Sequence, residues 1–128
     1  MTPHLDRITA DGAPAPIGPY SPAVRAGPFV FLSGQTPLDP SSGALIEGDV
    51  EAQTERVLAN LHAVLVAAGL TWSDVVRTTI FMTDLAHFAT VNRIYERTIG
   101  DARPARTTIQ VAGLPRGAQI EIEMLAGL

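Results

Sequence analysis

Two stretches near the C-terminus alternate polar and apolar residues with a period of two, the period of a β-strand that has one covered face. They are residues 104–111 (PARTTIQV) and 119–124 (QIEIEM), and a connection containing Gly and Pro lies between them. In the first stretch, Arg106, Thr108 and Gln110 share one face. In the second, Glu121 and Glu123 lie opposite the apolar residues. The pattern predicts two strands, most simply a hairpin with one polar face.

Arg106 is the first candidate for a functional side chain. It follows Pro104 and Ala105 directly at the start of a strand, so its rigid, donor-rich guanidinium projects from a fixed backbone. An arginine held beside Glu121 or Glu123 suits a small anionic substrate, and the alternative is a polar face that is simply solvated. Because a one-residue slip turns every side chain to the other face, alternation alone leaves open which glutamate lies nearer Arg106.

The length of 128 residues and the hydrophobic content of 46% predict one globular domain over residues 1–128. A run of about 18 apolar residues is absent, and the first residues contain neither the basic nor the apolar segment of a secretory signal. We therefore expect a cytoplasmic protein without a membrane anchor.

Several classes of mechanism are excluded by residue types that the chain lacks. Cysteine is absent, which removes thiolate zinc sites and cysteine nucleophiles, and all nine basic residues are arginine, which removes Schiff-base and P-loop lysines. His4, His62 and His87 have no spacing typical of metal ligands, so the sequence predicts no metal site. Ser33 lacks the Gly-x-Ser-x-Gly setting of a serine hydrolase.

The charge balance counts against nucleic acid as a general partner. The net charge is −4 and aromatic residues make up 5% of the chain, whereas surfaces that bind nucleic acid are basic. A local phosphate-binding patch stays open because arginines gather in the last third, and the alternative is a solvated helix face. These arginines are Arg93, Arg97, Arg103, Arg106 and Arg116.

The order of the remaining elements predicts an α+β fold. Strands are expected over residues 4–9, 23–26, 29–33 and 75–82. Amphipathic helices are expected from an Asp49 N-cap to Gly69 and from an Asp84 N-cap to about Gly100, the second with Phe88 and Tyr95 in its apolar stripe. Two long helices cover one face of the sheet. The other face needs a cover, for which a cyclic homo-oligomer is the economical solution, and the apolar tail 124–128 fits that role.

Tyr20 in a loop and Gly34 at the end of a strand are two further candidates for positions in a functional site. Tyr20 lies in a rigid proline-rich loop between Pro19 and Pro22, where it holds its hydroxyl in a pocket or, alternatively, packs its ring on the core. Gly34 follows an apolar strand directly and leaves room for a ligand or a neighbouring backbone, although a bulge or a turn explains it equally well.

Five stretches, in order and spread over nearly the whole chain, resemble the RidA/YjgF family of reactive intermediate deaminases. They are 17–20 (IGPY), 31–35 (FLSGQ), 88–92 (FATVN), 104–106 (PAR), and 114–115 (LP) followed by 120–123 (IEIE). Each stretch is weak alone, and their joint occurrence is the signal. The resemblance implies a chorismate-mutase-like α+β fold with a mixed β-sheet and two long helices on one face. It also implies a homotrimer with ligand clefts between neighbouring subunits.

The resemblance further implies a 2-iminobutanoate/2-iminopropanoate deaminase-like hydrolase. Its substrate is a small imino or enamine carboxylic acid, such as 2-aminoacrylate or 2-iminopropionate, which is hydrolysed to a 2-keto acid and ammonia without a cofactor. Arg106 then binds the substrate carboxylate, Glu121 activates water as the general base, and Tyr20 holds the water or the substrate. The other substrate-binding positions that the resemblance implies are Ser33, Gly34, Asn92 and Thr108.

Thr108 departs from the family pattern, because many relatives carry cysteine there. If this position acts through its backbone, threonine preserves activity and changes the pocket shape, which leaves substrate size open.

Two other functions stay open. One is a non-catalytic, regulatory or chaperone-like trimer that binds small metabolites in the same clefts. The other is an endoribonuclease, a label that family members have received, and the acidic charge and few aromatic residues count against it.

Overall fold

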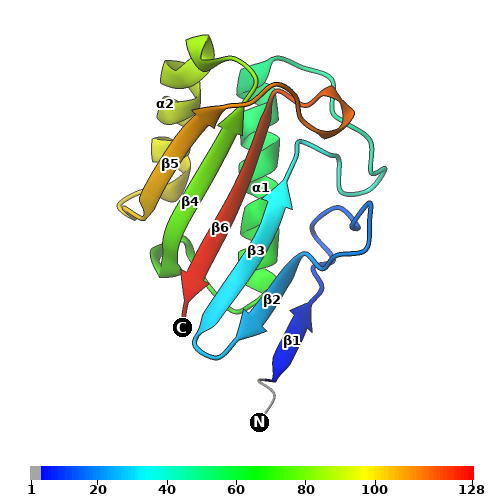
Figure 1. Ribbon diagram of the computed structural model, residues 1–128, viewed down its shortest axis with the longest axis vertical. Helices are drawn as coiled ribbons and strands as arrows, with labels where there is room; N and C mark the ends of the chain where they lie inside the picture. The colour runs from blue at the N-terminus through cyan, green and yellow to red at the C-terminus, as the bar shows by residue number, and fades with distance from the viewer. Residues whose placement is uncertain (1–3) are drawn as a thin grey trace.

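The computed structural model describes residues 4–128 as a six-stranded β-sheet with two α-helices (Figure 1). The strands are β1 (Leu5–Ile8), β2 (Ala23–Ala26), β3 (Phe29–Gln35), β4 (Val75–Met82), β5 (Ala105–Gln110) and β6 (Ile120–Gly127). The helices are α1 (Val50–Ala67) and α2 (Phe88–Ile99), and the short 3₁₀ turns are η1 (Trp72–Asp74), η2 (Leu85–His87) and η3 (Pro115–Gly117).

The sheet is mixed, with the strand order β1-β2-β3-β6-β4-β5. β4 and β5 run parallel and are connected through α2, whereas the other neighbouring pairs are antiparallel. The last strand, β6, lies inside the sheet between β3 and β4 (Figure 1). The predicted α+β fold with a mixed sheet and two helices is thereby confirmed.

The predicted C-terminal hairpin is wrong. β5 and β6 both form, but β4 lies between them. Alternation shows which residues share a face of a strand and carries no information about which strand is the neighbour. Here α2 returns the chain parallel to β4, as helical crossovers do, so β5 becomes an edge strand and β6 pairs with the other side of β4.

Local capping sets the helix bounds. At the start of α1 the Asp49 side chain accepts a hydrogen bond of 3.0 Å from the N–H of Ala52. Gly69, with φ of 75°, adopts the left-handed conformation that follows the end of α1. Asp84 also caps, but it caps the turn η2, so α2 begins only at Phe88. Within residues 4–128, neither helix is long and apolar enough to cross a bilayer.

The core lies between the helices and one face of the sheet. Its side chains come from both layers, and each strand contributes alternate residues. Fully buried members include Leu58, Leu61 and Leu65 of α1, Ile94 of α2, Ile80 and Met82 of β4, and Ile120 and Ile122 of β6. Because alternate residues of β6 point into this core, the residues between them point to the opposite face of the sheet.

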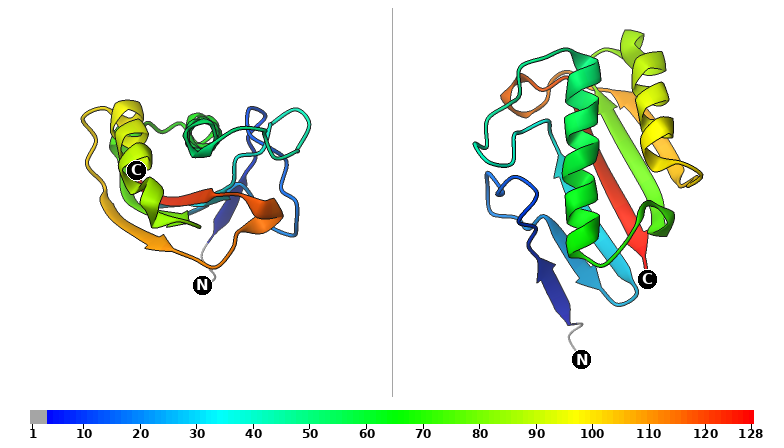
Figure 2. Two further views of the ribbon diagram at one scale, coloured as in Figure 1. Left: turned by 90° about the horizontal axis from the view of Figure 1, so that it is seen from above. Right: turned by 180° about the vertical axis from the view of Figure 1, so that it is seen from behind.

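Both helices lie on the same side of the sheet, and the opposite face is open within the chain (Figure 2). On that face Phe31 of β3 is 50% exposed, and Phe29 and Ile109 are exposed as well. An open apolar face of this kind is typical of an interaction surface. The C-terminal tail contributes less to it than expected, because Met124 and Ala126 are buried in the core.

Candidate functional site

Arg106 lies on the helix side of β5, in contact with α2. In the sheet register it pairs with Thr78, a fully buried residue of β4, so both side chains point toward the helices. Nη2 of Arg106 donates a hydrogen bond of 2.8 Å to Oδ1 of Asn92 in α2. Asn92 lies outside the apolar stripe of its helix, and the structure gives its amide a partner in Arg106.

A cavity of about 230 Å³ opens beside the Arg106 guanidinium, between α2 and the start of β5. It is lined by Asn92, Tyr95, Glu96, Ile99, Arg103, Pro104 and Arg106. Arg106 forms no ion pair with any of residues 4–128. Its positive charge is therefore available to an anion that enters the cavity.

Thr108 lies two residues beyond Arg106, on the same face of β5. Its hydroxyl oxygen is buried and has no hydrogen-bond partner in the part of the chain that the structure describes. A buried hydroxyl without a partner costs roughly 1–3 kcal/mol. A polar group of a ligand or of another subunit that reached this hydroxyl would relieve that cost.

Glu121 projects from β6 toward the open face of the sheet, between two buried isoleucines. An irregularity in the pairing of β3 with β6, between Leu32 and Gln35, brings Gly34 against it. A Cβ atom at Gly34 would lie 2.7 Å from Oε2 of Glu121, so a side chain at this position would push the carboxylate out of its present place. A β-bulge and the close approach of the Glu121 carboxylate thus occur together at Gly34.

The environment of Glu121 raises the pKa of its carboxyl group. Burial is the larger cause, because it penalises the charged form, and the like charge of Glu123 is the second. A carboxylate with a raised pKa is a stronger base than an exposed glutamate. This property suits proton abstraction from water at a functional site.

The loop that carries Tyr20 is tied to β3 beside the bulge. Oγ of Ser33 donates to the carbonyl oxygen of Ser21 (2.6 Å), and the N–H of Ser33 donates to the carbonyl oxygen of Pro22 (3.0 Å). Tyr20 is 48% exposed, so its ring does not pack on the core. Tyr20 and Gly34 line a recess of about 20 Å³, which has room for one water molecule.

The predicted site residues form two groups on separate strands. We call them the Arg106 group (Arg106, Asn92 and Thr108) and the Glu121 group (Glu121, Gly34, Ser33 and Tyr20). The structure brings together the members within each group and keeps the two groups apart, because Arg106 faces the helices and Glu121 faces the open side of the sheet.

The expectation that Arg106 lies beside Glu121 or Glu123 in one hairpin is wrong. Thr78 pairs with Arg106 on one side and with Met124 on the other, so the β6 residue on the Arg106 face is Met124. The physical reason is the intervening strand β4, whose register sets the two faces independently of the alternation in β5 and β6.

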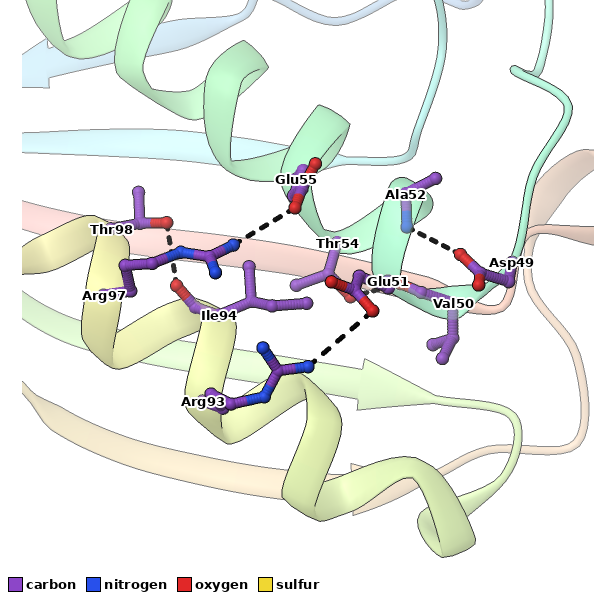
Figure 3. A network of polar contacts seen from close by, with 10 residues as sticks. All are labelled: Asp49, Val50, Glu51, Ala52, Thr54, Glu55, Arg93, Ile94, Arg97 and Thr98. Carbon is purple, nitrogen blue, oxygen red and sulfur yellow. Dashed lines mark hydrogen bonds and ion pairs between the residues drawn. The ribbon is translucent and has the colours of Figure 1, made fainter.

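Other arginines of the C-terminal third bind within the chain. Arg93 and Arg97 of α2 form ion pairs with Glu51 and Glu55 of α1, at 3.7 and 3.1 Å (Figure 3). Arg103 donates to two backbone carbonyl oxygens of the turn that follows α2. Arg116 donates to the carbonyl oxygen of Gly43 at 2.7 Å. These four arginines each have a partner within the chain, and the phosphate-binding patch that their clustering left open stays a prediction.

Two aromatic residues at the site were predicted only as members of the apolar stripe of α2. The guanidinium carbon of Arg106 lies 5.0 Å from the ring centroid of Tyr95 and 5.7 Å from that of Phe88. One signal was available in the sequence. A tyrosine at a core position needs a partner for its hydroxyl, and here that partner is Thr78, at 3.0 Å.

The chain is similar over nearly its whole length to proteins of one family, which carry different functional names. A family model described as Endoribonuclease L-PSP matches residues 10–128. Protein DfrA of Myxococcus xanthus is 56% identical over 121 residues, which is 93% of this chain and 92% of that protein. The 2-iminobutanoate/2-iminopropanoate deaminase of Mus musculus is 46% identical over 119 residues, 93% of this chain and 88% of that enzyme. The crystal structure of the Rid family protein YyfA from Yersinia pestis has a TM-score of 0.95 at 43% identity, covering 98% of this chain and 100% of that one.

Proposed function

The chain belongs to the RidA/YjgF family, and from that premise we propose that it hydrolyses small 2-imino and enamine carboxylic acids to 2-keto acids and ammonia without a cofactor. The observation that carries the proposal is Arg106. Its half-buried guanidinium is held by a neutral amide and borders an open cavity, an arrangement that favours a small carboxylate. The mouse relative, a deaminase of 2-iminobutanoate and 2-iminopropanoate, supports the same substrate class.

In this proposal Glu121 is the general base of the hydrolysis. It takes a proton from water, the water oxygen bonds to the C=N carbon, and the electron pair of the C=N bond moves to the nitrogen, which is protonated. The C–N bond then breaks, the hydroxyl proton is transferred to the departing nitrogen, and the 2-keto acid and ammonia leave. An enamine first takes up a proton at carbon and loses one from nitrogen, which makes it the imine. Because an imine is already electrophilic, positioning and one base suffice.

Tyr20 and Gly34 place the water in this mechanism. The recess that they line has the volume of a single water molecule, about 20 Å³. Gly34 borders both this recess and the Glu121 carboxylate. Gly34 is thus the residue that the recess and the base share, and the Tyr20 hydroxyl, which accepts a bond of 3.4 Å from the N–H of Ile17, can still donate to a water.

A complete site in this proposal needs two chains. Since Arg106 and Glu121 face opposite sides of one sheet, they meet where the Arg106 group of one subunit adjoins the Glu121 group of the next. The open apolar face, with Phe31 half-exposed, supports association of copies through the sheet. We propose a cyclic homotrimer with three such clefts, the number that the family resemblance implies.

The proposal is tested with imines that an amino-acid oxidase generates in situ, namely 2-iminopropanoate, 2-iminobutanoate and a bulkier imino acid. We expect the wild type to accelerate the release of ammonia and 2-keto acid. Arg106→Ala should lower kcat/KM at least ~100-fold, because the substrate carboxylate loses its charged partner. Arg97→Ala, which removes an exposed arginine of α2 outside the cavity, is the matched control and should retain the wild-type rate.

The outcomes separate the candidate functions. Unchanged rates in Arg106→Ala would contradict the role of Arg106. A wild type that binds 2-keto acids in calorimetry but accelerates none of the imines would instead be a metabolite-binding protein. The family model carries the name endoribonuclease, so RNA cleavage is measured in parallel. Cleavage that survives purification and disappears in a defined site variant would favour that function.

A further inference from the structure

The Tyr95 ring forms one wall of the Arg106 site. Tyr95 is 5% exposed, and its ring centroid lies 5.0 Å from Cζ of Arg106. Its hydroxyl donates a hydrogen bond of 3.0 Å to Oγ1 of Thr78, which is fully buried. Thr78 is also the strand partner of Arg106. One residue of β4 therefore neighbours both: it bonds the Tyr95 hydroxyl and pairs with Arg106 in the sheet.

A second ring contacts the same guanidinium. Phe88, at the start of α2, has its ring centroid 5.7 Å from Cζ of Arg106, and its side chain is exposed. Both distances fall within the range of about 6 Å over which an aromatic face attracts a cation. We call Phe88 and Tyr95 the aromatic clamp. With the Asn92 amide oxygen, the clamp supplies three contacts from three residues of α2.

All three contacts come from groups without net charge. A carboxylate partner would also hold the guanidinium, but a substrate carboxylate would then have to displace or share it. Aromatic faces and an amide oxygen restrain the cation while its full charge stays available. The cavity that borders Arg106 and Tyr95 gives an incoming anion access to that charge.

We infer that the aromatic clamp positions Arg106 for the substrate carboxylate, with Tyr95 as the main positioning residue. This inference rests on the proposed function and deepens it. The clamp orders the guanidinium before the substrate arrives, so less side-chain freedom is lost on binding. The bond changes at C=N are assigned to the Glu121 group, and loss of the clamp therefore weakens substrate binding more than it slows the chemical step.

The experiment compares Tyr95→Leu, which removes the ring, with Tyr95→Phe, which removes only the hydroxyl. KM and kcat are measured with 2-iminobutanoate, and Kd is measured for 2-oxobutanoate by calorimetry. We expect Tyr95→Leu to raise KM and Kd about 10-fold to 30-fold, with kcat changed less than about threefold. Tyr95→Phe should stay within about threefold of the wild type in all three constants, because it keeps the aromatic face.

Two further variants guard against a folding defect. Tyr95→Leu and Tyr95→Phe both leave the Thr78 hydroxyl without its partner, so each is also made together with Thr78→Val, which removes that buried group. Phe88→Leu changes an exposed ring and tests the clamp even if the buried position does not tolerate leucine. It should raise KM and Kd in the same direction by a smaller factor. Circular dichroism and light scattering confirm that each variant keeps the fold and assembly of the wild type.

The results distinguish the clamp from the proposed function. If folded Tyr95→Leu and Phe88→Leu have unchanged KM and Kd, the clamp is overturned and the deaminase assignment stands. The same holds if Tyr95→Phe is impaired as much as Tyr95→Leu. If the wild type binds 2-oxobutanoate but does not hydrolyse imines, the proposed function is overturned. In that case the clamp is still supported if the Kd for 2-oxobutanoate rises when the rings are removed. A wild type that neither binds nor hydrolyses overturns both.

Discussion

Glu121 and Glu123 lie two residues apart on β6, and the charge of Glu123 adds to burial in raising the pKa of Glu121. A base works only in its ionised form, so kcat/KM should fall as the pH drops through this raised pKa. The acid limb of the pH profile is therefore expected above the usual range of a glutamate, about 4.3.

Glu123→Gln isolates one of the two causes. It removes the like charge and leaves the burial, so the acid limb should move to lower pH, while the plateau at higher pH stays unchanged. The measurement is kcat/KM against pH for both proteins, with the exposed Glu47→Gln as the control. A limb that stays in place, or that moves to higher pH, would show that Glu121 is not the titrating base.

Residue types at the candidate site were predictable, and their contacts were not. Arg106 stands out in the sequence because a rigid Pro-Ala start projects it from a strand. Its bond to Asn92 and the buried hydroxyl of Thr108 depend on how α2 packs on β5. Residues 92 and 106 are brought together by the β4–α2–β5 crossover, and no local pattern of charge or periodicity encodes that packing.

At the scale of elements, periodicity and capping predicted the helices and strands closely, because both signals are local. Asp49 and Gly69 mark α1 through a side-chain cap and a positive φ. The pairing of β5 was not predictable in the same way. A strand with alternating residues pairs equally well in a hairpin or after a crossover, and the choice depends on the whole sheet.

Ser33 connects two elements whose relative position matters for the proposed water site. Its hydroxyl donates to the Ser21 carbonyl oxygen at 2.6 Å and so ties the loop of Tyr20 to β3. Ser33→Ala should lower kcat/KM roughly 5-fold, the effect of losing about 1 kcal/mol of hydrogen bonding that fixes the loop. Hydrogen exchange over residues 13–22 should become faster in the same variant.

The control for this prediction is Ser73→Ala, at an exposed serine of η1. It should change neither the rate nor the exchange. If Ser33→Ala lowered the rate without faster exchange of the loop, the hydroxyl would be acting on the substrate itself and not through the position of Tyr20.

At the scale of the whole molecule, the Arg106 group and the Glu121 group are the two halves of the proposed site, and they lie on opposite faces of one sheet. The sequence predicted the uncovered face from the small number of helices, and the structure shows it with Phe29, Phe31 and Ile109 exposed. The sequence could not predict that Arg106 and Glu121 lie on different faces, because that depends on the register of β4 with both of its neighbours. Their separation makes the shared-cleft proposal testable by mixing subunits.

Arg106→Ala and Glu121→Gln should each be inactive alone and recover activity when mixed under conditions of subunit exchange. A cleft is restored when a Glu121→Gln chain supplies its Arg106 and an Arg106→Ala chain supplies its Glu121. This combination occurs in about a quarter of the clefts of randomly mixed trimers. The mixture should therefore reach roughly a quarter of the wild-type rate. A chain carrying both substitutions, mixed with either single variant, should restore nothing. Exchange is verified by native mass spectrometry, and exchanged trimers without recovered activity would mean that Arg106 and Glu121 do not act in one cleft.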